Sequence, residues 1–172
     1  MARFISKLDF LQFSFERASH ENEELGETWR LLDSKAQATA TIAGVFIAAL
    51  FVFIAQAGRP PLGTAKWLVV LGVLSCVGSI YFAVRSMAMQ SVGVPMTAAE
   101  VMEDIEGLAA SPLQYNLRYE ALLVDSIDSC IAVNGEIQIV NDAKASRLKR
   151  AHFALSVAMV ASGTAAIFVL LS

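Results

Sequence analysis

The stretch AQATATIAGVFIAALFVFIAQA, residues 36–57, contains no charged residue. At about 1.5 Å per residue, an α-helix of this length covers a hydrocarbon layer roughly 30 Å thick. Two further stretches without charge, residues 67–84 and 151–172, have a similar length. The sequence therefore predicts an all-α membrane protein with three transmembrane helices.

Lysine and arginine are unevenly distributed around these stretches. Five of the 13 precede residue 36, six lie in residues 85–150, and only two lie in residues 58–66. Because basic residues concentrate in the cytoplasmic loops of membrane proteins, we expect residues 58–66 to form a short external loop. The N-terminus and residues 85–150 would then be cytoplasmic, with an external C-terminus, in a bacterial inner membrane. A chain with 56% hydrophobic and 17% charged residues also fits the membrane class better than a nucleic-acid-binding class.

The two cytoplasmic regions are predicted to be helical. Residues 1–35 contain no proline and indicate amphipathic and polar helices that lead into the first span. Thr97 and Glu100 form a capping-box pattern, so a short helix should follow and end before Pro112. Apolar residues then recur mainly at steps of three and four: Leu123, Ile127, Cys130, Val133, Ile137, Val140 and Leu148. This pattern predicts one long amphipathic helix that continues into the third span, residues 151–172. Five of its residues form the docking stripe, a candidate surface for a soluble partner: Leu123, Ile127, Cys130, Ile137 and Val140.

Residues 131–139 also allow a different structure. Apolar residues alternate there around Asn134-Gly135, which is a strong local signal for a β-hairpin. A two-stranded hairpin is only marginally stable alone, and the rest of the chain offers no third strand. We therefore favour a helix, with a bend at Gly135 as one form of it.

The sequence indicates no enzyme, cofactor or metal site. No serine or cysteine lies in a nucleophile motif, and no glycine-rich phosphate loop is present. Glu16, His20 and Glu24 share one helical face and could hold a metal ion, but a solvated charged face is much commoner at such spacing.

The first span carries the pattern that is most informative about function. Gln37, Thr41, Gly44 and Ala48 lie on one side of the predicted helix. Small residues four apart let helix backbones approach closely in a membrane, and polar residues can line an aqueous path. Three helices alone enclose no pore, so a channel would require several copies of the chain. At the membrane boundary, Asp33 and Lys35 are charges whose pairing could differ between closed and open states.

The residues Asp33-Ser34-Lys35-Ala36 before the first span resemble an element of the Pycsar transmembrane effectors and the related SLATT group of bacterial anti-phage proteins. Tyr119 and Leu122, and the run from Lys144 through Leu148-Lys149-Arg150-Ala151, are similar as well, and the likeness covers roughly residues 25–170. The resemblance implies homo-oligomers that breach the inner membrane when a partner or cyclic nucleotide reports infection. No separate nucleotide-binding domain fits in this chain. A cytoplasmic sensor protein, or a nucleotide held by the cytoplasmic helices, would supply the signal.

Two functions remain open from the sequence. The first is a homo-oligomeric effector that perturbs the membrane on a cytoplasmic signal, through the face of Gln37, Thr41, Gly44 and Ala48. The alternative is a non-conducting membrane anchor whose docking stripe binds a soluble partner. A transporter is less consistent with the sequence, because no inverted repeat is present.

Overall fold

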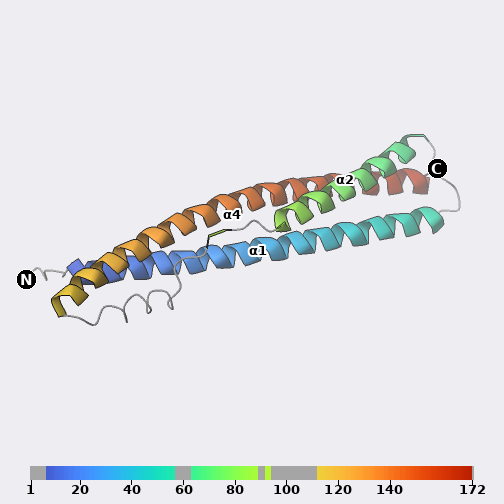
Figure 1. The fold of residues 1–172 in the computed structure, drawn as a ribbon. Helices are drawn as coiled ribbons and strands as arrows, with labels where there is room; N and C mark the ends of the chain where they lie inside the picture. The colour runs from blue at the N-terminus through green and yellow to red at the C-terminus, as the bar shows by residue number, and fades with distance from the viewer. Residues whose placement is uncertain (1–6, 57–62, 89–91, 94–111, 172) are drawn as a thin grey trace, which may run out of the picture. The chain divides into compact units, whose positions relative to one another are not determined.

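The computed structural model describes residues 7–56, 63–88, 92–93 and 112–171. These residues form three helices and no strand: α1 (Lys7–Gln56), α2 (Thr64–Met87) and α4 (Pro112–Leu171) (Figure 1). Each helix contains a segment that is long and apolar enough to cross a membrane. The all-helical prediction and the prediction of three candidate spans are confirmed for the described part of the chain.

The helices are longer than the predicted spans. The helix predicted before residue 36 and the first span are one helix, which continues through Gly26. The second span lies inside α2, which begins three residues earlier than predicted and ends three residues later. The third span is the last third of α4. Residues 131–140 are helical, so the long helix was correctly predicted and no hairpin forms there. Residues 1–6 and the short helix predicted after Thr97 lie outside the described residues.

The chain divides into two compact units, and α1 and α4 contribute to both. Unit 1 consists of Met1–Trp29 and Gln90–Asn141, and unit 2 consists of Arg30–Met89 and Asp142–Ser172. Unit 2 therefore contains the three apolar segments, and unit 1 contains the more polar halves of the two long helices.

In unit 1, α1 and α4 form a parallel helix pair. Lys7 contacts Glu120, and Leu25 contacts Asn141, so the residue numbers increase together along the two helices. The buried residues of α4 recur with a seven-residue period through Leu123, Cys130 and Ile137, with Ile137 half-buried. This period is typical of helices that wrap around each other as a coiled coil.

In unit 2, α2 runs antiparallel to both other helices. Ser86 of α2 contacts Lys144 of α4, whereas Ser79 contacts Ala151, so the residue numbers change in opposite directions. The face of α2 that is buried is composed of small residues, namely Ala65, Gly72, Cys76, Ser79, Ala83 and Ser86. Small residues allow the main chains of neighbouring helices to approach closely, which is how helices associate in a lipid solvent.

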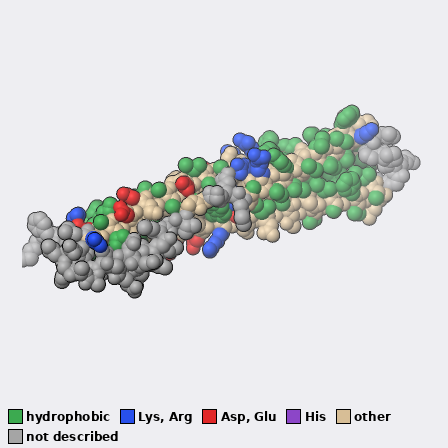
Figure 2. All heavy atoms as spheres, in the orientation of Figure 1, with side chains coloured by type: hydrophobic (Ala, Val, Ile, Leu, Met, Phe, Trp, Pro, Cys, Tyr) green, Lys and Arg blue, Asp and Glu red, His purple; other side chains and the backbone are tan. Residues whose placement is uncertain are grey.

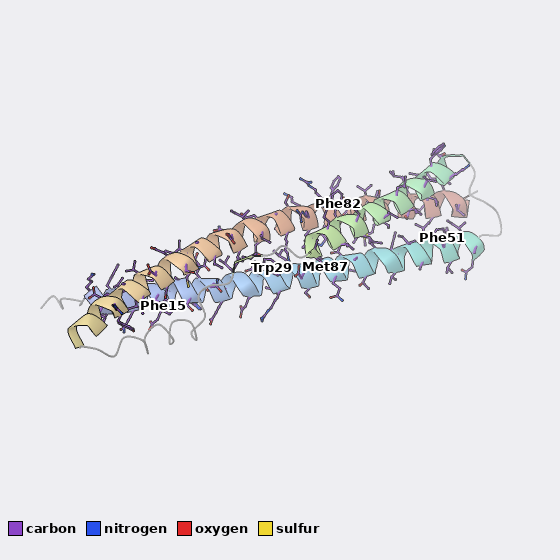
Figure 3. The ribbon with its side chains drawn as sticks, viewed as in Figure 1. Phe15, Trp29, Phe51, Phe82 and Met87 are labelled. Carbon is purple, nitrogen blue, oxygen red and sulfur yellow. The ribbon has the colours of Figure 1, made fainter. Side chains whose placement is uncertain are left out.

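The core of unit 2 is correspondingly thin. Ala36, Ala83, Leu148 and Ala151 are buried together, and Phe82 and Met87 pack against them (Figure 3). Large apolar side chains are turned outward instead, among them Val45, Phe51, Trp67, Leu74, Phe153, Val160 and Ile167. Hydrophobic side chains cover much of the visible surface of unit 2, with Lys and Arg beside them (Figure 2). Such an apolar exterior suits a lipid solvent better than water.

Candidate functional site

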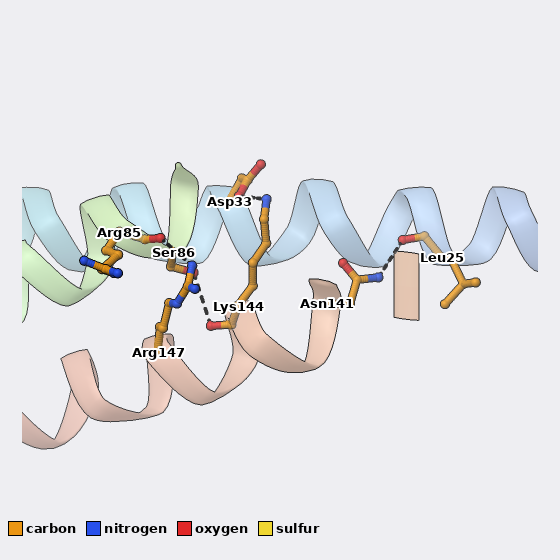
Figure 4. Close-up of polar contacts among 7 residues, drawn as sticks. All are labelled: Leu25, Asp33, Arg85, Ser86, Asn141, Lys144 and Arg147. Carbon is orange, nitrogen blue, oxygen red and sulfur yellow. Dashed lines mark hydrogen bonds and ion pairs between the residues drawn. The ribbon is translucent and has the colours of Figure 1, made fainter. Parts of the chain in front are cut away.

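The polar contacts of unit 2 are concentrated where its three apolar segments begin or end. The ammonium group of Lys144 on α4 donates to the carboxylate of Asp33 on α1 at 2.6 Å (Figure 4). Only 2% of the Lys144 side chain is exposed, against 36% of Asp33. Burying a charge is costly unless the charge is paired. This contact therefore fixes Asp33 of α1 beside Lys144 of α4, just before the apolar segments of the two helices.

Two contacts join α2 to α4 at the same level. The Ser86 hydroxyl donates to the main-chain carbonyl of Lys144 at 3.2 Å, and the Arg147 guanidinium donates to the carbonyl of Arg85 at 2.9 Å (Figure 4). About two turns further along, the Ser79 hydroxyl donates to the carbonyl of Ala151 at 2.9 Å. Hydroxyl groups reach main-chain carbonyls here because the α2 face is made of small residues.

A fifth contact, between α1 and α4, determines which atom donates at a histidine ring. The buried Thr39 hydroxyl lies 2.9 Å from Nε2 of His152 and 2.7 Å from the carbonyl oxygen of Lys35. The carbonyl can only accept, so the hydroxyl hydrogen goes to Lys35. His152 therefore donates from Nε2 to the Thr39 oxygen.

The predicted lining residues of the first span do not take part in packing within the chain. Gln37, Thr41 and Ala48 are exposed, and an added Cβ at the half-buried Gly44 would meet nothing within 4 Å. The buried face of α1 in unit 2 is a different one, formed by Ala36, Thr39, Ala43 and Leu50. The predicted face is thus turned away from α2 and α4.

The two boundary charges have different environments. Asp33 contacts Lys144, a residue that was not among the predicted site residues, and Lys35 is exposed. The charge that Asp33 meets therefore comes from the third span's helix.

The docking stripe lies mostly inside unit 1. Leu123 and Cys130 are buried, and Ile127, Ile137 and Val140 are half-buried. On the same side of α4, Asn134 donates to the carbonyl of Ala18 at 3.0 Å and accepts from Asn22 at 2.8 Å. Helix α1 of the same chain therefore covers much of this stripe. Burial also raises the pKa of the Cys130 thiol, because the charged thiolate loses its solvation.

The sequence analysis missed Lys144, Asn134, Asn141 and Gly72. Lys144 follows Leu123, Cys130 and Ile137 at steps of seven residues, so its position in the buried stripe was a usable signal.

The group considered as a metal site contains His20 and Glu24, which are an exposed pair 3.5 Å apart. In the described residues, no three His, Cys, Asp or Glu side chains gather in a way that could hold a metal ion. Compared with protein-family models, curated proteins and solved structures, the chain gives no match.

Proposed function

We propose that this chain is a homo-oligomeric effector of the bacterial inner membrane, which permeabilises the bilayer when its cytoplasmic helices receive a signal. The proposal takes the three candidate spans as transmembrane, with the N-terminus and unit 1 in the cytoplasm. The excess of basic residues in residues 1–35 and 85–150 supports this orientation.

One observation carries the proposal. The face of Gln37, Thr41, Gly44 and Ala48 is made of small and polar residues, and none of the three described helices covers it. The centre of unit 2 is packed by alanine and serine side chains instead. A second copy that packs on this face would bring polar side chains of several first spans together.

The anchor alternative receives less support. It requires a docking stripe that is accessible to a soluble partner, whereas Leu123 and Cys130 are buried in unit 1. A partner or nucleotide that acts on unit 1 would instead work through α1 and α4, because both helices continue into the apolar segments.

The test is inducible expression in bacteria with a membrane-potential dye, alone and together with the proteins encoded beside this one. We expect depolarisation by the parent chain and its loss in Gly44→Leu, with equal amounts of protein in the membrane. The matched control is Gly163→Leu, because Gly163 is also a membrane-helix glycine with open space around it. Equal depolarisation by Gly44→Leu and the parent would refute the role of this face.

A further inference from the structure

The outer surface of unit 2 carries a groove between α2 and α4. Its volume is about 360 Å³. It is lined by Leu68 and Leu71 of α2 and by Ser156, Val157, Val160, Ala161 and Thr164 of α4. The lining is almost entirely apolar, and the groove lies in the part of both helices that is apolar enough to cross a membrane.

The same helix faces lead from the groove to a group of arginines. Leu71, Gly78 and Arg85 follow one another at steps of seven residues on α2, and seven residues are close to two helical turns. On α4, Ala161, Ala154 and Arg147 are related in the same way. Gly78 and the half-buried Ala154 are small, so no bulky side chain at these positions fills the surface between the groove and the arginines.

The arginines at this level of the two helices form hydrogen bonds with neutral groups. Arg147 donates to the carbonyl of Arg85 at 2.9 Å, and Arg85 donates to the hydroxyl of Tyr81 at 3.0 Å. Both acceptors are neutral. Arg150, about one turn further along α4 than Arg147, is exposed. Among the described residues, no carboxylate forms an ion pair with any of these three side chains.

We propose that this surface binds an anionic phospholipid, with its phosphate between Arg85 and Arg147 and an acyl chain along the groove toward Leu71. Guanidinium groups bind phosphate oxygens through paired, charge-assisted hydrogen bonds. Arg85 and Leu71 are fourteen residues apart, which corresponds to about 21 Å along the helix. One leaflet with its headgroups is about 20–22 Å thick, so the length of the site fits a single lipid.

This inference goes beyond the permeabilising activity and rests only on the membrane insertion of unit 2 with Arg85 at the cytoplasmic side. The cytoplasmic leaflet is rich in anionic lipid, and basic pockets between membrane helices are known to hold such headgroups. The occupant we infer is therefore a lipid of the surrounding bilayer.

The experiment uses the full-length protein in a neutral detergent and measures its melting temperature with three additives. These are phosphatidylglycerol, phosphatidylcholine with the same acyl chains, and inorganic phosphate. Phosphatidylglycerol should raise the melting temperature by several degrees, because it binds only the folded state. The other two additives should leave it unchanged. Equal stabilisation by both lipids would overturn the proposal, and so would equal stabilisation by inorganic phosphate.

Variants locate the lipid. Arg85→Gln with Arg147→Gln should weaken the apparent affinity for phosphatidylglycerol by about a hundredfold, because the variant loses the charge-assisted hydrogen bonds of two guanidinium groups to the phosphate. The matched control is Lys35→Gln, because Lys35 is an exposed basic residue of α1, and α1 contributes no residue to the lining of the groove. An equal loss in the control would indicate general attraction of charge and would contradict a defined site. If the arginine variant melts too low for the assay, native mass spectrometry of retained lipid makes the same comparison.

Substitutions at the groove distinguish a bound lipid from a second copy of the chain. Gly78→Leu should weaken phosphatidylglycerol binding, because its side chain would fill the surface between the groove and the arginines, where an added Cβ meets nothing within 4 Å. Leu71→Cys should form no disulfide between chains in the bilayer, and efficient formation would assign the groove to a second copy instead. Gly44→Leu should retain the lipid effect, so a failure of the permeabilising function leaves this test intact.

Discussion

The ammonium group of Lys144 lies 2.6 Å from the carboxylate of Asp33, and the two residues belong to α4 and α1 of unit 2. The pair is asymmetric, because Lys144 is 2% exposed whereas Asp33 is 36% exposed. The same lysine also accepts from Ser86 of α2 through its main-chain carbonyl. Lys144 therefore connects all three helices beside the alanine core that contains Ala36 and Ala151.

Asymmetric burial predicts asymmetric effects of mutation. Asp33→Ala removes the carboxylate from a buried ammonium group, and we expect a loss of stability of about 3 kcal/mol, the lower end of the range for breaking a buried pair. Lys144→Met should cost clearly less, because the remaining Asp33 carboxylate is partly open to water and a methionine fills the same space. Unfolding in mixed detergent micelles measures both. Equal losses would contradict the burial of Lys144. Lys35→Met, at an exposed position of the same helix turn, is the control.

The pair also shows where reasoning from the sequence was limited. Lys144 continues the seven-residue series of Leu123, Cys130 and Ile137, so its burial was foreseeable. Its partner was not, because the pairing depends on the offset between α1 and α4. The contacts of Asn22 with Asn134 and of Thr39 with His152 have offsets of 112 and 113 residues. A single sequence contains two helical faces here but no direct measure of how far one is shifted along the other.

The glycines of the spans illustrate a second limit. Gly44 and Gly72 both lie in apolar helices among small residues, and the sequence analysis selected Gly44 as the close-contact position. Among the described residues, Gly72 is in close contact with another helix, whereas Gly44 is open. The lengths of the charge-free stretches predicted the spans because length is a property of one helix. Which face packs is a property of the assembled unit.

Asn134 is expected to set the register of α1 against α4 in unit 1. It donates to the carbonyl of Ala18 and accepts from Asn22, and 5% of it is exposed. A buried asparagine in a helix pair selects one register at a cost in stability. Asn134→Leu should therefore leave the melting temperature equal or higher while allowing shifted registers.

Cross-linking tests this register directly. A short cross-linker should join Lys7→Cys to Glu120→Cys, because the parent side chains contact each other there. In the Asn134→Leu background this yield should fall, and linkage of Lys7→Cys to Ile127→Cys, one heptad away, should rise. Gln138→Leu, an exposed change on the same helix, should alter neither yield.

Cys130 gives a prediction about pH. Burial raises the pKa of its thiol in the folded state, so folding favours the neutral form. This contribution to stability is complete below the ordinary thiol pKa of about 8.5 and is lost as the pH rises through the higher folded value. The parent chain should thus lose more stability than Cys130→Ala between about pH 8.5 and 10, as measured by melting temperature. Parallel pH profiles of the two proteins would refute the assignment.

Gly72 is where α2 and α4 approach most closely among the described glycines of the apolar segments. A Cβ built on Gly72 would lie 2.5 Å from Oγ of Ser162 and 3.7 Å from the carbonyl oxygen of Ala158. Gly72→Leu should therefore destabilise the folded protein by about 1–3 kcal/mol, because overpacking forces the two helices apart. Thermal melting in one detergent measures the loss. The matched control is Gly78→Leu on the same helix, where the added side chain meets nothing within 4 Å.

A smaller substitution separates side-chain from main-chain overlap at this site. The Ser162 hydroxyl is buried and has no hydrogen-bond partner among the described residues, so it can rotate away without losing a bond. Gly72→Ala should then cost about 1 kcal/mol at most, the lower end for overpacking, and combination with Ser162→Ala should restore the parent melting temperature. Gly72→Leu should not be rescued by the same change, since its longer side chain also meets the Ala158 carbonyl. Rescue of Gly72→Leu by Ser162→Ala would show that the backbones of α2 and α4 are further apart than this contact requires.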